Sequence, residues 1–127
     1  ELGSRTLRFG RIVHVLSLTA RQPIGGLATS NALRPAVAGL IADLARENAV
    51  HGITVNAVCP GMTRTARIEE LAATPDRVRA LEAMVPMGRL AAPEEIAAPV
   101  AFLCSEQASY LTGAIIPVDG GVTARCL

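Results

Sequence analysis

Short apolar runs alternate with longer helical repeats along this chain. The segments 10–17, 53–61 and 113–121 are rich in β-branched residues and end at polar residues, proline or glycine. Such runs are typical of strands that are buried on both faces of a sheet. Stretches with helical spacing separate them. The order predicts right-handed crossovers between parallel strands, and therefore an α/β fold.

The first connecting helix is expected over residues 30–48. Pro35 is predicted in its first turn, where no internal hydrogen bond is lost. Charged residues oppose an apolar stripe that should face the sheet. This stripe consists of Leu33, Val37, Leu40, Ile41 and Leu44.

Two further helical regions follow the second strand. Residues 62–88 are polar and alanine-rich, with helical spacing in "RIEEL" and "RVRALEAM". Another helix should begin at Pro93, because Glu94 and Glu95 then lie in the first turn, where acidic side chains suit the positive end of the helix dipole. Pro99 falls within this helix and is expected to kink it or to delay its regular start.

Composition narrows the class of protein. A chain of 127 residues that is 50% hydrophobic suits one soluble domain. The net charge is +1, the twelve basic residues are scattered arginines, and aromatic residues make up 2%, so neither nucleic acid nor an anionic membrane is favoured as a partner. No apolar run approaches the ~18 residues that span a bilayer, and no leader pattern opens the sequence. We expect a cytoplasmic protein.

The cysteines fit the same setting. Cys59, Cys104 and Cys126 are widely spaced and match no metal-ligand pattern. An odd number of free thiols is simplest in a reducing compartment. Cys59 and Cys104 lie in apolar stretches, so both are expected to be buried like small hydrophobic residues.

Four motifs give the chain a family resemblance. The segments "GRIVHVLS", "GITVNAVCPGMTRT", "PMGRLAAPEEIAAPVAFLCSEQASYLTG" and "IIPVDGG" resemble the C-terminal half of the short-chain dehydrogenase/reductases, in order and spacing, over residues 10–121. The resemblance implies one domain over 1–127, a partial Rossmann-like doubly wound parallel sheet that binds NAD or NADP at its carboxyl edge. The family's glycine-rich phosphate-binding turn is not among these motifs. Cofactor binding by this chain alone is therefore expected to be weak or absent.

The resemblance assigns cofactor contacts to the turn after the second strand. Pro60 and Gly61 match residues beside the nicotinamide ring, Thr63 matches the position whose backbone pairs with the carboxamide, and Thr65 matches a neighbouring hydroxyl contact. A glycine lets the backbone approach a flat ring, and a proline fixes the direction of the turn. The alternative is an ordinary turn that ends a strand.

The reacting groups of the family are matched only in part. Ser17 aligns with the serine that hydrogen-bonds the substrate oxygen. Leu27 and Asn31 stand where the family has its tyrosine and lysine, in a loop shorter than that of the family. A lysine lowers the pKa of the tyrosine, which is about 10 when free. Leu27 has no proton to give, and Asn31 can hydrogen-bond a cofactor ribose but carries no charge.

Other side chains could supply the proton or the charge that the tyrosine and lysine provide in the family. Arg34 lies one helical turn beyond Asn31 and either supplies charge there or lies on the surface. His14 should lie on the face opposite Ser17, as a hydrogen-bonded core or loop histidine. Tyr110, the only tyrosine, is expected to serve packing. The remaining polar candidates are two hydroxyls whose pKa is too high without a base, and a histidine at a helix end: Thr29, Ser30 and His51.

Three functions remain open. The first is an NAD(P)-dependent oxidoreductase that moves hydride between the cofactor and a carbonyl or alcohol substrate. The second is an inactive family member that acts as a binding module and forms a homo-oligomer through residues 30–48 and 93–121. The third is a substrate-holding partner of a separate nucleotide-binding half. Residues 62–88 correspond to a lid over the substrate, and either an apolar roof or helix packing explains Met62, Leu71, Met84, Val85 and Met87.

Overall fold

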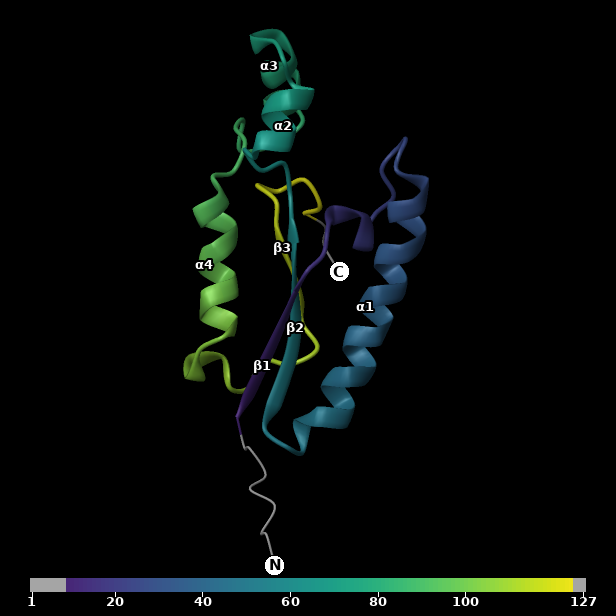
Figure 1. Ribbon diagram of the computed structural model, residues 1–127, viewed down its shortest axis with the longest axis vertical. Coiled ribbons are helices and arrows are strands. Elements are labelled where there is room, and N and C mark those ends of the chain that lie inside the picture. Colours follow the sequence, from purple (N-terminus) through teal and green to yellow (C-terminus); the bar gives the residue numbers. More distant parts are fainter. Residues whose placement is uncertain (1–8, 125–127) are drawn as a thin grey trace, which may run out of the picture.

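The protein is a three-stranded parallel sheet between two long helices, in a computed structural model that describes residues 9–124 (Figure 1). The elements in chain order are β1 (Gly10–Val15), the 3-10 helix η1 (Leu18–Ala20), α1 (Ala28–Ala49), β2 (Ile53–Pro60), α2 (Ala66–Leu71), α3 (Pro75–Ala83), α4 (Pro93–Leu103), the 3-10 helix η2 (Glu106–Ala108) and β3 (Ile115–Val118). The predicted strands, the helical character of 62–88 and the start of a helix at Pro93 are confirmed.

The strands lie in the order β1-β2-β3. Their register pairs Gly10 with Ile53 at one end of the sheet, and Pro60 with Val118 near the other. Because all three strands are parallel, their carboxyl ends meet at one edge, where α2 and α3 also stand (Figure 1). The residues that follow each strand are thereby brought together.

The two faces of the sheet have separate cores. α1 covers one face and α4 the other (Figure 1). The buried cluster on the α1 side is Leu16, Ile41, Ala45, Val55, Ala57 and Cys59. The cluster on the α4 side is Val58, Leu103 and Ala108, with Val13, Ile96 and Ile116 packed against it. β2 supplies residues to both clusters because alternate side chains point to opposite faces.

β1 is less buried than its apolar sequence predicts. Ile12 is 44% exposed and Val15 is 57% exposed, whereas the six inner residues of β2 are all buried. The prediction of burial on both faces is therefore wrong for β1. The reason is its place at the edge of the described sheet, where it pairs with β2 alone.

α1 begins earlier than predicted, at Ala28, so Pro35 lies in its interior and not in its first turn. There the ring removes the hydrogen bond to the carbonyl four residues before it. The predicted apolar stripe is also partly wrong, because Leu33 and Leu40 are more than half exposed. The side that packs on the sheet is Val37, Ala38, Ile41, Leu44 and Ala45.

The short helices have conventional boundaries. Thr65 caps α2 by accepting a hydrogen bond from the Ile68 N–H, and Thr74 caps α3 by accepting one from the Arg77 N–H.

Pro99 lies inside α4, as expected. Within residues 9–124, no helix combines the length and the apolar character needed to cross a bilayer.

Two expected burials are wrong. Cys59 is buried, but Cys104 is exposed at the C-cap of α4. Tyr110, in the segment between η2 and β3, is fully exposed and does not pack. Cys126 lies outside the described residues.

Candidate functional site

The turn after β2 is packed tightly against the end of β3. The Gly61 N–H donates to the Val118 carbonyl at 2.9 Å. A Cβ on Gly61 would lie 2.6 Å from the Asp119 Cα, which is closer than real Cβ atoms approach. The resemblance predicts that a glycine at position 61 lets the backbone approach the cofactor ring. The structure shows a second need for glycine here, because the residue packs closely on the β3 end.

Thr63 follows this turn, and its own peptide groups are not used in the bridge that it forms. It forms a parallel bridge with Ala91, in which the Ala91 N–H donates to the Met62 carbonyl at 2.9 Å and the Arg64 N–H donates to the Ala91 carbonyl at 2.8 Å. A parallel bridge of this kind uses the peptide groups on either side of Thr63. The N–H and C=O of Thr63 itself are therefore directed away from Ala91. A donor and an acceptor side by side can pair with a carboxamide.

The two threonine hydroxyls hold this backbone in place. Thr63 Oγ1 donates to the Gly61 carbonyl at 3.1 Å. Thr65 Oγ1 accepts from the Ile68 N–H at the start of α2, so its own hydrogen remains available to another acceptor. The resemblance to the family places a cofactor contact at each of these residues.

Asp119 organises the turn after β3. Its carboxylate accepts hydrogen bonds from the Gly121 N–H at 2.9 Å, the Thr123 N–H at 2.9 Å and Thr123 Oγ1 at 2.6 Å. Burial raises the pKa of this carboxyl, but the hydrogen bonds from Thr123 and Gly121, with the charge of Arg21, outweigh it and leave the pKa lowered. Asp119 is therefore ionised and fixed. Sequence reasoning did not single it out, although an aspartate before two glycines is a turn signal.

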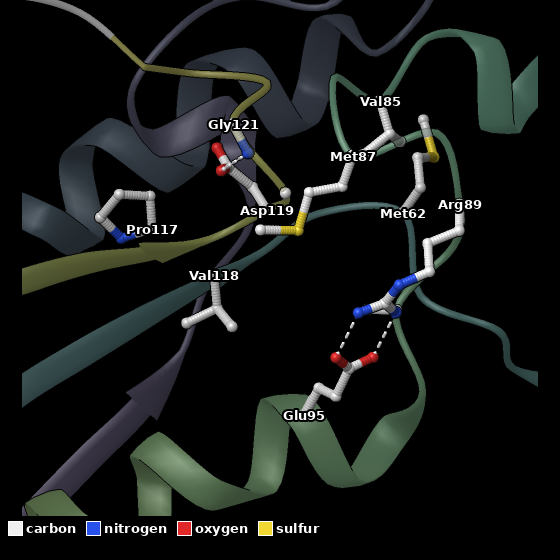
Figure 2. A pocket seen from close by; sticks show the side chains of 11 residues that line it. Met62, Val85, Met87, Arg89, Glu95, Pro117, Val118, Asp119 and Gly121 are labelled. Atoms are coloured by element: carbon white, nitrogen blue, oxygen red, sulfur yellow. Dashed lines mark hydrogen bonds and ion pairs between the residues drawn. The ribbon is translucent and has the colours of Figure 1, made fainter.

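A pocket of about 370 Å³ lies between this turn, the loop before α4 and the first turn of α4 (Figure 2). Its apolar wall contains Met62, Val85 and Met87. These are three of the five residues proposed for an apolar roof. Leu71 and Met84 do not line it and are mostly exposed.

The polar side of the pocket is neutralised by an ion pair. Arg89 donates from Nη1 and Nη2 to the two oxygens of Glu95, each at 2.6 Å (Figure 2). The Arg89 guanidinium, and then the Ala92 N–H, lower the pKa of Glu95 to about 2. The pair thus persists across the neutral range, and the pocket has no free charge from these residues.

Ser17 ends β1 and begins the loop that leads to α1. Its Oγ accepts a hydrogen bond from the Thr19 N–H at 3.3 Å, as the N-cap of η1. The hydroxyl hydrogen of Ser17 is left to donate, which is what the polarisation of a substrate oxygen requires. Thr19 is 1% exposed, and its Oγ1 lies 2.8 Å from the Ser30 Oγ of α1.

Leu27 and Asn31, which the resemblance aligns with the tyrosine and lysine of the family, lie at the start of α1. Leu27 is the N-cap residue and is 46% exposed. The Asn31 side chain binds one residue of the loop twice: the Ile24 N–H donates to Oδ1 at 3.0 Å, and Nδ2 donates to the Ile24 carbonyl at 2.8 Å. Oδ1 retains one lone pair and Nδ2 one hydrogen. A ribose contact by Asn31 stays a prediction.

Cys59 is buried near Ser17 and is not activated as a nucleophile. Burial raises the pKa of the Cys59 thiol, although a hydrogen bond with the Ser17 backbone and the charge of Arg21 act in the opposite direction. A nucleophilic cysteine needs a lowered pKa and exposure, and Cys59 has neither. Its place is in the core under the site.

The compensating residues are not gathered at the site. Arg34 Nη1 donates to the Val15 carbonyl at 3.4 Å, so it contacts β1 and not Asn31. His14 was expected to be hydrogen-bonded, but its Nε2 is buried without a partner among the described residues. His51 lies just past the end of α1, as predicted. The described part of the chain holds no cluster of histidine, cysteine and carboxylate side chains that could bind a metal.

This edge of a parallel sheet, flanked by helices on both faces, is the arrangement of a Rossmann-type nucleotide-binding fold. A family model described as enoyl-(acyl carrier protein) reductase matches residues 3–123. Acetoacetyl-CoA reductase of Shinella zoogloeoides is 40% identical over 121 residues, which are 94% of this chain and 49% of that protein.

Solved structures agree. The NADPH-dependent reductase YwfH, involved in bacilysin biosynthesis, has a TM-score of 0.89 at 31% identity, over 94% of this chain and 49% of its own. A 2-deoxy-D-gluconate 3-dehydrogenase from Agrobacterium tumefaciens, described as putative and solved with bound NADP, has a TM-score of 0.84 at 40% identity, over 91% and 47%.

The chain belongs to the short-chain dehydrogenase/reductases, a family of NAD(P)-dependent oxidoreductases. It spans about half the length of the curated relatives that it matches.

Proposed function

We propose that this chain forms the nicotinamide end of an NAD(P) site and serves hydride transfer to or from a carbonyl or alcohol substrate. When bound, the cofactor supplies the hydride. Thr63 pairs its backbone with the carboxamide, while Pro60, Gly61 and Thr65 shape the wall beside the ring. Ser17 donates its hydroxyl hydrogen to the substrate oxygen.

The observation that supports this proposal most is the orientation of Thr63. Its N–H and C=O are turned away from the bridge with Ala91, so both are available to a group with one donor and one acceptor. Relatives of the chain support the cofactor class, since one of the similar structures holds NADP. The proton-donating tyrosine of the family is not offered at position 27, so we expect slow turnover or none.

Titration with NADH and NADPH tests the proposal directly. The chain has no tryptophan, so reduced nicotinamide fluorescence can be followed without that background. We expect saturable binding with a Kd on the order of 1 mM, or about 4 kcal/mol. The absence of a saturable signal at millimolar cofactor would exclude this function for the chain alone.

A pair of variants tests the role of the Thr63 backbone. Thr63→Pro removes an N–H that the bridge with Ala91 does not use, and it should weaken binding about tenfold. Thr63→Ala keeps the backbone and should bind as the wild type does. Equal loss in both would assign the contact to the side chain and contradict the backbone pairing. Thermal unfolding of both variants checks that they are folded.

A second function is favoured by exposed apolar surface. Leu33 and Leu40 on α1 are 60% and 53% exposed, and Ile12 and Val15 lie on the edge strand. These side chains suit association. In this alternative the chain is an inactive family member that binds a partner or its own copies through 30–48 and 93–121. Sedimentation that shows a monomer at every concentration up to about 100 μM would count against it.

A further inference from the structure

Two side chains of α1, Ser30 and Asn31, hold the loop between β1 and α1 against the start of that helix. Leu18 and Thr19 at the start of this loop are both buried. Further along, Ile24 is hydrogen-bonded to Asn31 of α1. The Leu27 N–H donates to the Ile24 carbonyl at 3.2 Å, and Gly26 has a φ of +80°. These features are those of a type II turn over 24–27, in which glycine supplies the positive φ.

Asn31 is matched chemically to this turn. Its amide accepts from the N–H and donates to the C=O of the same residue, Ile24. Among side chains of this length only asparagine offers both an acceptor and a donor on one planar group. A lysine would leave the Ile24 N–H without an acceptor, and a carboxylate would face the Ile24 carbonyl with like charge. The turn thus explains asparagine, whereas a ribose contact alone does not.

A second link leads from α1 to Ser17. Ser30 precedes Asn31, and its Oγ lies 2.8 Å from Thr19 Oγ1. The N–H of the same Thr19 donates to Ser17 Oγ. The contact with Ser30 therefore holds Thr19, whose N–H occupies one lone pair of the Ser17 hydroxyl. Because that lone pair is occupied, the direction in which the Ser17 hydroxyl hydrogen can point is limited.

We propose that Asn31 is a positioning residue whose amide latches Ile24 onto α1 and, with the Ser30–Thr19 contact, holds the loop 18–27 in the conformation that orients Ser17. This inference rests on the proposed function only in its last step, the contact of Ser17 with substrate.

Amide hydrogen exchange tests the latch in the cofactor-free chain. Asn31→Ala and Asn31→Lys both remove the acceptor and should speed exchange of the Ile24 amide about tenfold, the equivalent of one lost hydrogen bond. Asn31→Asp keeps an acceptor and should speed it less. The matched control is Asn48→Ala, because Asn48 lies on the same helix but donates within it, to the Leu44 carbonyl. Wild-type exchange at Ile24 in Asn31→Lys would overturn the latch.

Cys59 reports on the Ser17 end of the loop. Its thiol is buried in the core near Ser17, while Cys104 is exposed in the same molecule and serves as the internal reference. The double variant Ser30→Ala with Asn31→Ala should raise the labelling rate of Cys59 relative to Cys104 about tenfold or more. Thr29→Ala, an exposed neighbour on α1, should not. An unchanged ratio in the double variant would break the link to Ser17.

NADPH affinity separates the latch from a ribose contact. If Asn31→Ala weakens NADPH binding while the Ile24 amide stays protected, Asn31 binds the cofactor and the latch is wrong. If exchange rises while affinity is unchanged, the latch stands. Should the wild-type chain bind no NADPH, the proposed function fails, and the exchange and labelling measurements still decide the latch.

Discussion

The carboxyl ends of β2 and β3 and the loop after β1 lie at the same edge of the sheet, yet they use their polar groups differently. At β2, the backbone of Thr63 is directed away from its bridging partner. Where the loop meets α1, the Asn31 amide is hydrogen-bonded to the Ile24 backbone, and the Thr19 and Ser30 hydroxyls are hydrogen-bonded to each other. The part of the site that depends on backbone geometry is open to a ligand. In the loop, most of the polar side chains are already hydrogen-bonded within the protein, although the hydroxyl hydrogen of Ser17 stays available to donate.

The largest expected effect comes from a substitution in the turn after β2. Gly61→Ala would place a Cβ 2.6 Å from the Asp119 backbone, so the turn after β2 or the end of β3 must move. We expect a loss of about 3 kcal/mol in the free energy of unfolding, as for overpacked cores, measured by urea denaturation.

Gly39→Ala is the matched control for that variant. Gly39 lies in α1, and a Cβ there would meet nothing within 4 Å. This change should raise the free energy of unfolding by about 0.5–1 kcal/mol through helix propensity. A similar loss in both variants would contradict the close packing at Gly61.

The next effect concerns the turn after β3 and depends on pH. Asp119→Asn replaces a carboxylate that accepts hydrogen bonds from Gly121 and Thr123, and it should cost about 2 kcal/mol near pH 7. Because the pKa of Asp119 is lowered in the folded chain, its stabilisation is present above the unfolded value of about 3.9 and is lost as pH falls through the folded pKa.

The difference between wild type and Asp119→Asn should therefore shrink below about pH 4. Urea midpoints across pH 2.5–7 measure it. Asp76→Asn, at an exposed position on α3, is the control and should change stability by no more than about 0.5 kcal/mol. A difference that is constant across this range would show that the charge of Asp119 is not involved.

A double variant tests the loop after β1 and the start of α1. Leu27→Tyr with Asn31→Lys introduces the tyrosine and lysine that the resemblance expects at these two positions, but it removes the acceptor for the Ile24 N–H. We expect no ketone reduction by these 127 residues, because none of their motifs matches the family's phosphate-binding turn, and a loss of about 1 kcal/mol in stability. NADPH oxidation with a panel of ketones measures the first and thermal unfolding the second. Measurable reduction would prove the expectation wrong.

The smallest effect on folding comes from exposed apolar residues. Leu40→Glu on α1 should change the unfolding free energy of the monomer by no more than about 0.5 kcal/mol, since Leu40 is 53% exposed. If residues 30–48 form an interface, the same change should lower the sedimentation coefficient at high concentration. Glu47→Gln, a polar change on the same helix, is the control, and equal behaviour of the two variants would remove this face from any interface.

The order of elements was predictable because it follows from local patterns. Alternating apolar runs and helical repeats, together with Pro93 at a helix start, depend on neighbours in sequence. Burial was less predictable. The exposure of Val15 and Leu33 depends on what lies beside β1 and α1 in space, and Tyr110 is exposed because of the path of one turn.

The candidate site divides in the same way. Pro60 ends β2, and Gly61 and Thr63 come directly after it, so motif spacing placed all three at the correct edge of the sheet. The role of Asn31 could not be predicted, since it depends on a loop residue seven positions earlier whose backbone conformation leaves no mark in the sequence. Neither could the contact of Gly61 with Asp119, which lie 58 positions apart in the chain.

The open side of β1 has a practical consequence for handling the protein. Within residues 9–124 this strand pairs on one side only, and its other side offers a row of peptide groups flanked by Ile12 and Val15. Such an edge is a template onto which any extended segment can add. A preparation of these 127 residues alone is therefore expected to form strand-paired aggregates slowly at high concentration, and a single lysine introduced on this strand should reduce their growth.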